Sequence, residues 1–122
     1  MGDSAGNDKL VRDFLLLWER RDTEQVVAAC TEDAVWHFRP LKPIVGRDAI
    51  RAFAQKYADI PGGPYEIRLQ VATHRVVMNE RTDHVTHDGK SVTLATCGVF
   101  EIEDGQIKAW RDYFDTSGLN AT

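Results

Sequence analysis

The chain has 122 residues, 43% hydrophobic and 28% charged, which is typical of one ordinary soluble domain with a single core. Its formal net charge is −4 and its charged residues are scattered, so no basic stripe or patch indicates binding to nucleic acid or anionic lipid. The polar N-terminus has no apolar stretch like that of a secretory signal, and no apolar run reaches the length of a membrane span. We expect one domain over residues 1–122, flexible over 1–7 and cytoplasmic, that binds neither nucleic acid nor membrane.

The first half of the chain predicts two helices, a strand and a third helix. Apolar residues recur at helical spacing over residues 8–21, and a short second helix follows, which Thr23 can cap. Thr31–Phe38 then has the pattern of a strand that ends before two prolines. A third helix opens at Gly46, and the stretch Ile60–Pro64, rich in proline and glycine, ends it. The apolar faces of these helices should form a core with the strands, and their main members are Phe14, Trp18, Ile50 and Phe53.

The second half predicts an antiparallel sheet. Asp88-Gly89 and Asp104-Gly105 are strong signals for two-residue hairpin turns, because both turn residues must accept a positive φ. The predicted strands are 65–73, 76–86, 91–103 and 106–114. We therefore predict an α+β fold: a cone-shaped, curved, antiparallel or mixed β-sheet whose concave face is covered by the three helices of the N-terminal half, with a pocket inside.

The two cysteines, Cys30 and Cys97, have no redox or metal-binding spacing, and we predict that both are buried free thiols. His84 and His87 lie close together, but only neighbouring aspartates accompany them, so a metal site is the weaker interpretation. We expect neither a metal nor a cofactor.

Charged residues interrupt two of the predicted strands. Side chains alternate across a strand, so Asn79, Arg81 and Asp83 share one face of the first. In the last strand, Asp112 shares a face with two large aromatic residues, while Arg111 points to the opposite face. If the two strands lie near each other, the Arg81 guanidinium can sit between the two carboxylates.

Two carboxyl groups in unequal surroundings can act as an acid and a base. Burial raises a carboxyl pKa and a nearby arginine lowers it, so that one group is ionised while the other holds a proton. Opening an epoxide with water requires a base for the proton of the water and an acid for the departing oxygen. A structural ion-pair network is the alternative, and spacing alone supports it about equally.

Three segments carry a resemblance to a known family: NERTDH (Asn79–His84), CGVFEIEDGQIKAWRDYFD (Cys97–Asp115) and EDAVWHFRPLKPIVGRDAI (Glu32–Ile50). Over almost its whole length the chain resembles the limonene-1,2-epoxide hydrolase family, part of a wider group of cone-shaped folds that includes nuclear transport factor 2 and the SnoaL-like cyclases. The most specific element is the R-x-D strand combined with the closing W-R-D-Y-F-D. The resemblance implies a nuclear transport factor 2-like domain.

The resemblance also implies catalytic roles. Asp112 matches the base that activates the attacking water, Asp83 the acid that protonates the epoxide oxygen, and Arg81 the residue that links them. The family also holds its water with a tyrosine and an asparagine two residues apart. The matching positions here are Trp36 and Phe38, which leave the water with fewer hydrogen-bonding partners.

The remaining pocket wall follows from alternation along the strands. On the strand 91–103 the pocket residues are Leu94 and Thr96, or Ala95 and Cys97 if a bulge reverses the facing. The substrate-binding residues that we predict are Trp36, Phe38, Asn79, Leu94, Thr96 and Trp110.

Together these observations predict a cofactor-independent hydrolase that opens an epoxide of a small apolar molecule, terpenoid or polyketide-like, to a vicinal diol in one step. A SnoaL-like cyclase or isomerase with the same carboxylates is one alternative, and a non-catalytic domain that binds a hydrophobic ligand is another. The uncovered face of the sheet would expose Val92, Val99 and Tyr113, which predicts a homodimer.

Overall fold

A computed structural model of the chain describes residues 3–119. Its helices are α1 (Ser4–Glu19), α2 (Thr23–Ala28) and α3 (Arg47–Lys56), followed near the C-terminus by the 3-10 turn η1 (Thr116–Leu119). Its strands are β1 (Cys30–Arg39), β2 (Ile44–Val45), β3 (Tyr65–Ala72), β4 (Val76–His87), β5 (Lys90–Glu103) and β6 (Gln106–Phe114).

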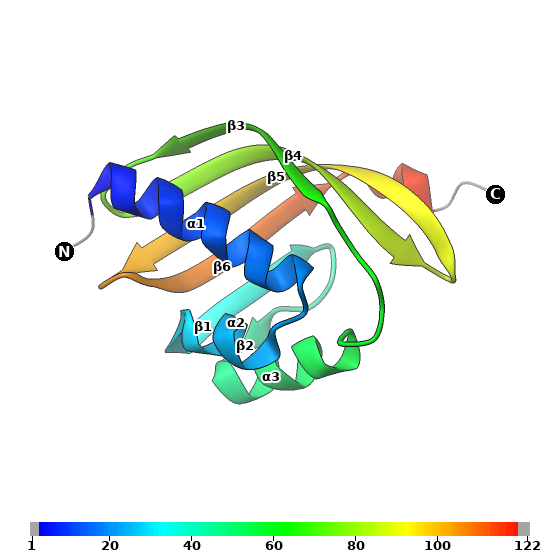
Figure 1. Ribbon diagram of the computed structural model, residues 1–122, viewed down its shortest axis with the longest axis horizontal. Helices are drawn as coiled ribbons and strands as arrows, with labels where there is room; N and C mark the ends of the chain where they lie inside the picture. The colour runs from blue at the N-terminus through cyan, green and yellow to red at the C-terminus, as the bar shows by residue number, and fades with distance from the viewer. Residues whose placement is uncertain (1–2, 120–122) are drawn as a thin grey trace.

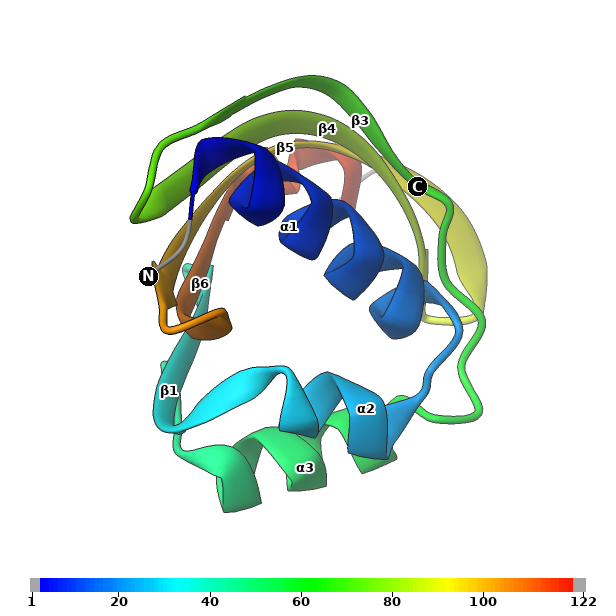
Figure 2. The ribbon, with the colours of Figure 1, turned by 60° about the vertical axis from the view of Figure 1, so that its left-hand side comes forward.

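The six strands form one mixed sheet in the order β2-β1-β6-β5-β4-β3 (Figure 1). β1 runs parallel to β6, and every other neighbouring pair is antiparallel. Figure 2 shows the sheet arched over the helices, with α1 under the strands β3 to β5 and the pair α2 and α3 on the far side of the interior. The predicted α+β fold, a curved sheet with helices on its concave face, is confirmed.

Aromatic side chains fill the core between α1 and the middle of the sheet. The rings of Phe14 and Trp110 lie edge to face with centroids 5.3 Å apart, and those of Trp36 and Trp110 lie 4.9 Å apart. The ring of Phe100 stacks on that of Trp110, with centroids 5.4 Å apart. These rings exclude water from the interior and provide a rigid floor for the strands that carry the charged residues.

Helix ends and one short strand differ from the sequence prediction. α1 begins at Ser4, four residues before the predicted start, and residues 1 and 2 lie outside the described residues. The flexibility of residues 1–7 stays a prediction. Asp22, and not Thr23, caps α2, because its carboxylate accepts a hydrogen bond from the Gln25 amide. The strand β2 was not predicted, since two residues are too few to show a period.

The alternation of side chains along β5 determines on which side of the sheet Cys97 lies. Leu94 and Thr96 are buried on the concave side, so the alternative in which a bulge reverses their facing does not hold. Cys97 is therefore exposed on the convex side, and the prediction that it is buried is wrong, whereas Cys30 is buried as predicted. None of the helices within residues 3–119 has the length and apolar character needed to cross a membrane. The cytoplasmic location stays a prediction.

Candidate active site

One glycine allows the charged residues of two separated strands to meet. In the register of the sheet, Gly98 of β5 pairs with Asn79 on β4 and with Asp112 on β6, so β5 lies between the two carboxylate-bearing strands. A Cβ atom on Gly98 would lie 2.9 Å from Asp112 Oδ1 and would collide with Arg81 Nη1. The Arg81 side chain thus reaches across β5 only because residue 98 has no side chain.

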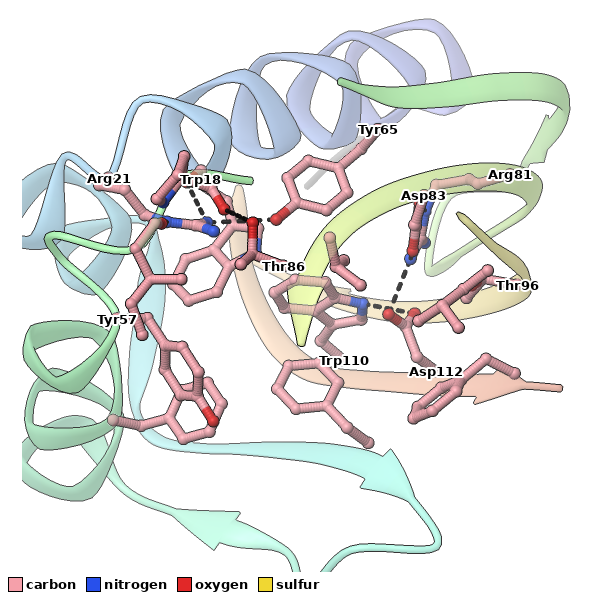
Figure 3. Close-up of a pocket in the computed structure, with 17 residues that line it drawn as sticks. Trp18, Arg21, Tyr57, Tyr65, Arg81, Asp83, Thr86, Thr96, Trp110 and Asp112 are labelled. Atoms are coloured by element: carbon pink, nitrogen blue, oxygen red, sulfur yellow. Dashed lines mark hydrogen bonds and ion pairs between the residues drawn. The ribbon is translucent and has the colours of Figure 1, made fainter. Parts of the chain in front are cut away.

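The guanidinium of Arg81 lies between the two carboxylates, as the alternation of the strands predicts (Figure 3). Arg81 Nε donates to Asp83 Oδ1 at 3.0 Å and Nη2 donates to Asp83 Oδ2 at 2.8 Å, which makes a bidentate pair. Nη2 also donates to Asp112 Oδ2 at 2.7 Å. Arg81 is 1% exposed, and the two aspartates are 5% and 6% exposed, so this network is shielded from bulk water.

Three further hydrogen bonds hold this network in place. Arg81 Nη1 donates to Asn79 Oδ1 at 2.9 Å, and Asn79 Nδ2 in turn donates to Gln70 Oε1 at 3.0 Å. Trp110 Nε1 donates to Asp112 Oδ1 at 2.8 Å, which fixes the orientation of that carboxylate. Asn79 therefore helps to position Arg81. It is not among the residues that line the cavity described below.

Burial and charge act in opposite directions on the two ends of this network. Burial raises the pKa of the Asp112 carboxyl above its ordinary value, although the positive charge and hydrogen bond of Arg81 oppose the shift. Burial alone would lower the pKa of Arg81, but the charges of Asp112 and Asp83 outweigh it and raise that pKa, so Arg81 stays a cation. Asp112 thus has a greater affinity for a proton than an ordinary aspartate, a property that suits a general base.

A cavity of about 190 Å³ lies beside Arg81, Asp83 and Asp112. Of the predicted substrate-binding residues, four line it: Phe38, Leu94, Thr96 and Trp110. Trp36 does not line it, since the ring is 0% exposed and packs inside the aromatic core. Alternation correctly places Trp36 and Phe38 on one face of β1, but only the position of α1 decides that the first is covered.

Much of the remaining wall comes from α1 and the residue after its C-cap, from α3 and the segment that follows it, and from the first residue of β3. Its members include two residues expected in the core, Trp18 and Phe53, which belong to the core and also reach the cavity. The others, for which the sequence carries no site pattern, are Arg21, Tyr57, Ile60, Pro61 and Tyr65. Their place at the cavity depends on how α1 and α3 pack, which no local pattern reports.

Thr96 has an unusual hydroxyl group. Its Oγ1 is buried and has no hydrogen-bond partner among the described residues, and Trp36 Nε1 is in the same condition. Only Thr96 lines the cavity. Since buried polar groups normally find partners, this hydroxyl is available to a water molecule or ligand in the cavity.

Comparison with known proteins identifies the family. The sequence profile of the limonene-1,2-epoxide hydrolase catalytic domain matches residues 5–121. The chain belongs to this family. It is 32% identical over 105 residues to the epoxide hydrolase EphG of Mycobacterium tuberculosis, a match that covers 86% of this chain and 70% of that protein.

Solved structures of the same fold agree with this family membership. An epoxide hydrolase of M. tuberculosis, described as similar to the limonene-1,2-epoxide hydrolases, superposes with a TM-score of 0.86 at 28% identity, over 96% of this chain and 88% of that one. SalBIII, an epoxide hydrolase/cyclase-like enzyme in the formation of the salinomycin pyran ring, superposes with a TM-score of 0.81 at 17% identity, over 91% and 92% of the two chains. At that identity, SalBIII shows only that the fold is shared.

Membership of the family supports an epoxide hydrolase. It also makes the residues at two positions of β1 informative about the site. Arg81, Asp83 and Asp112 lie in two of the three segments that carry the resemblance to the family. The two positions on β1 that the resemblance matches to a water-holding tyrosine and asparagine contain a buried core residue, Trp36, and an apolar wall residue, Phe38. The polar groups beside the cavity in this chain come from other strands and from the ends of α1 and α3.

Proposed function

We propose that the protein is a cofactor-independent hydrolase that opens the epoxide of a small, mainly apolar molecule, terpenoid or polyketide-like, to a vicinal diol. The observation that carries this proposal is a guanidinium held between two buried carboxylates at the wall of an aromatic cavity. The relatives named as epoxide hydrolases support the same reaction. The cavity of about 190 Å³ is smaller than the pockets of about 300 to 1,000 Å³ that bind drug-sized ligands, which favours a small substrate.

In the proposed reaction, ionised Asp112 takes a proton from water while the water oxygen bonds to one carbon of the epoxide. The bond from that carbon to the epoxide oxygen breaks, and protonated Asp83 gives its proton to the departing oxygen. One proton has then moved from Asp83 to Asp112, and its return through solvent resets the pair. Arg81 contacts both carboxylates and stabilises the negative charge that remains on one of them in every state.

The attacking water needs a second partner besides Asp112, and Thr96 is suited to this role. Thr96 lies two residues before Gly98, the cross-strand partner of Asp112, so Thr96 and Asp112 are diagonal neighbours on the concave face. Its hydroxyl is buried without a partner among residues 3–119 and lines the cavity. We assign to it the positioning of the water that Trp36 and Phe38 cannot provide.

The first test is turnover of a panel of small and bulky epoxides, including limonene oxide, in water labelled with oxygen-18. Wild type should form diol with one labelled oxygen, and Asp112→Asn and Asp83→Asn should each lose a factor of about 10² to 10⁴ in kcat. Glu101→Gln, a matched change at a carboxylate that pairs with Arg111 outside the cavity, is the control and should remain active. Labelled diol formed at the wild-type rate by Asp112→Asn would overturn the proposal.

A second test concerns the water. Thr96→Val keeps the shape of the side chain but removes the hydroxyl, and it should lower kcat by about 10-fold or more with little change in KM. Thr96→Ser keeps the hydroxyl and should retain most of the activity. Equal activity of the Val and Ser variants would remove Thr96 from the mechanism.

One observation favours a cyclase or isomerase as the second candidate. Trp36 and Phe38 deprive the cavity of the family's water-holding pair, and an enzyme that adds a hydroxyl of its own substrate to an epoxide, or that moves a proton on a ketone, needs no bound water. Products without oxygen-18, formed by wild type and lost in Asp112→Asn, would identify this reaction. A domain that only binds ligands should instead show no turnover and should retain ligand affinity in Asp112→Asn.

We also propose that the protein forms a homodimer through the convex face of the sheet. Leu69, Val71 and Met78 are exposed there, together with Tyr113. Of the other expected members, Val99 is half-buried on this face, next to Met78. The prediction that Val92 belongs to it is wrong, because Val92 pairs with Val85 of the cavity wall and alternation places it on the concave side with Leu94. Contiguous apolar residues on the uncovered side of a sheet are typical of an interface, and a second copy of the chain presents the same surface.

A further inference from the structure

The cavity has a second polar end, formed by Arg21 and Tyr65. Figure 3 shows this pair on one side of the cavity and Asp112 with Thr96 on the other. Arg21 Nη1 donates a hydrogen bond to the Tyr65 hydroxyl oxygen at 3.2 Å. Both residues line the cavity, but the reaction proposed above uses neither of them.

The backbone of Arg21 is in a conformation that disfavours arginine. Its φ is +57°, in the left-handed region, at the residue that follows the C-cap of α1. Glycine is the usual residue at this position because it has no Cβ atom. An arginine here implies that its side chain serves a purpose.

Part of that purpose is structural. Arg21 Nε donates to the Ile60 carbonyl at 3.1 Å and Nη1 donates to the Trp18 carbonyl at 2.9 Å. The guanidinium also lies 4.6 Å from the centre of the Trp18 ring. These contacts do not neutralise its charge, since no carboxylate within residues 3–117 forms an ion pair with Arg21; the nearby Glu19 carboxylate accepts from the Tyr65 amide instead. The cavity wall thus contains a cation without a counter-ion from the described residues.

Tyr65 adds a hydrogen-bond donor beside that cation. Burial raises the pKa of its phenol, although Arg21 opposes the shift, so the group keeps its proton. The oxygen already accepts from Arg21, and the hydroxyl hydrogen has no acceptor among the described residues. Gly62 leaves room around the pair, because a Cβ there would collide with Arg21 and would lie 2.9 Å from the Tyr65 oxygen.

Tyr65 is the cross-strand partner of Asp83, but its hydroxyl points away from that carboxylate toward Arg21, on the side of the cavity opposite Asp112 (Figure 3). We propose that Tyr65 and Arg21 bind an acceptor oxygen, of a carboxylate or a carbonyl group, at the end of the substrate that lies on this side of the cavity. Arg21 offers only donor hydrogens and positive charge, and the Tyr65 hydroxyl, whose oxygen already accepts from Arg21, offers its hydrogen. Both recognise an electron-rich oxygen. Between the two polar ends the wall is largely apolar, with Trp18, Phe53 and Ile60 among its members. This inference rests on the proposed function and refines it: the substrate is an epoxide with a hydrocarbon body and one polar oxygen-bearing end.

The experiment compares three epoxides of one chain length whose remote ends are a carboxylate, a methyl ester and a methyl group. Wild type should hydrolyse the first or second with kcat/KM at least about 10-fold above the third. Tyr65→Phe keeps the ring and the backbone contacts of Arg21, and it should abolish this preference by raising KM for the oxygen-bearing substrates. The readout is the ratio of kcat/KM for the oxygen-bearing substrates to kcat/KM for the methyl-ended epoxide, so an equal loss on all three substrates does not count as loss of the preference. Tyr113→Phe, the same change on the convex face, should keep the preference.

Arg21→Gly separates the two kinds of oxygen. Glycine adopts a positive φ without a steric penalty, so this variant removes the charge and adds no backbone strain after α1. A carboxylate ligand should then lose more kcat/KM than the ester, whereas a carbonyl ligand should lose mainly in Tyr65→Phe. An undiminished preference for the oxygen-bearing substrates in both variants would overturn the inference.

A binding measurement separates failure of this inference from failure of the proposed function. Calorimetry with octanoate, which has no epoxide, should give binding to wild type that is at least about 10-fold weaker in Tyr65→Phe, and octylammonium should not bind. This result without any epoxide turnover would retain the polar end and reject the hydrolase. Equal octanoate affinity in wild type and Tyr65→Phe, or no binding to wild type, would reject the polar end whether or not epoxides are opened.

Discussion

At the scale of single residues, Gly98 decides whether Arg81 can contact both carboxylates. Gly98→Ala places a methyl group where Arg81 Nη1 now lies and 2.9 Å from Asp112 Oδ1, so the buried network must move. We expect a loss of about 10²-fold in kcat and of about 1 to 3 kcal/mol in the free energy of unfolding. Activity assays and urea denaturation measure both. Cys97→Ala, on the exposed side of the same strand, should leave both unchanged; equal behaviour of the two variants would contradict this role of Gly98.

The pKa of Asp112 gives a prediction with a definite sign. Because burial raises this pKa in the folded state, the folded protein binds a proton there more tightly than the unfolded chain does. Ionised Asp112 therefore lowers the free energy of unfolding at neutral pH. This destabilisation disappears as the pH falls from above the raised folded-state pKa to below the ordinary pKa of the unfolded chain. The free energy of unfolding of wild type minus that of Asp112→Asn should rise as the pH is lowered from about 7 to 4.

The control for this measurement has the opposite sign. The Ser117 amide donates to Asp115 and lowers the pKa of that exposed carboxyl, so its contribution to stability is lost at low pH. The difference between wild type and Asp115→Asn should therefore fall as the pH is lowered. Urea denaturation across the pH range tests both signs, and a flat or falling difference for Asp112→Asn would contradict the assignment.

At the scale of elements, the segment Ile60–Pro64 between α3 and β3 forms part of the cavity wall and is held by a few hydrogen bonds. Thr86 Oγ1 donates to the Pro61 carbonyl at 2.9 Å, and the Gly63 amide donates to the His84 carbonyl at 2.6 Å. Thr86→Val removes the first bond. We expect faster hydrogen exchange of the Gly63 amide, a loss of about 1 kcal/mol in stability, and KM raised several-fold with kcat retained.

Ser91→Ala is the matched control for this variant. Ser91 is the cross-strand partner of Thr86 on β5 and its side chain is exposed. The variant should show wild-type exchange and wild-type KM. If the Gly63 amide exchanged no faster in Thr86→Val than in Ser91→Ala, the hydrogen bond from Thr86 to Pro61 would not be needed to hold the segment Ile60–Pro64 in place.

At the scale of the whole molecule, the convex face predicts the state of association. Met78 is 49% exposed at the middle of the apolar surface, and its neighbours across the strands are Val71 and Val99. Wild type should sediment as a dimer at micromolar concentration, and Met78→Lys should sediment as a monomer because it would bury charges at the interface. Leu16→Lys, at an exposed apolar residue on α1, should leave the dimer intact. A monomeric wild type would contradict the proposed dimer.

The sequence by itself determined the features that depend on neighbouring residues in the chain. Alternation along a strand placed Asn79, Arg81 and Asp83 on one face, and the Asp-Gly turns fixed the order of the last three strands. Both signals are local, since side-chain direction and turn conformation follow from the backbone of a few residues. The resemblance to a family then attached a chemistry to those faces.

Only the tertiary structure decided which of these residues meet and which reach the cavity. It put β5 between the two charged strands, which makes Gly98 part of the site, and it covered Trp36 with α1. It also brought Arg21 and Tyr65, 44 positions apart in the sequence, to one end of the cavity. Such contacts join segments distant in the chain, and their partners depend on how helices pack on the sheet, a property that no local pattern contains.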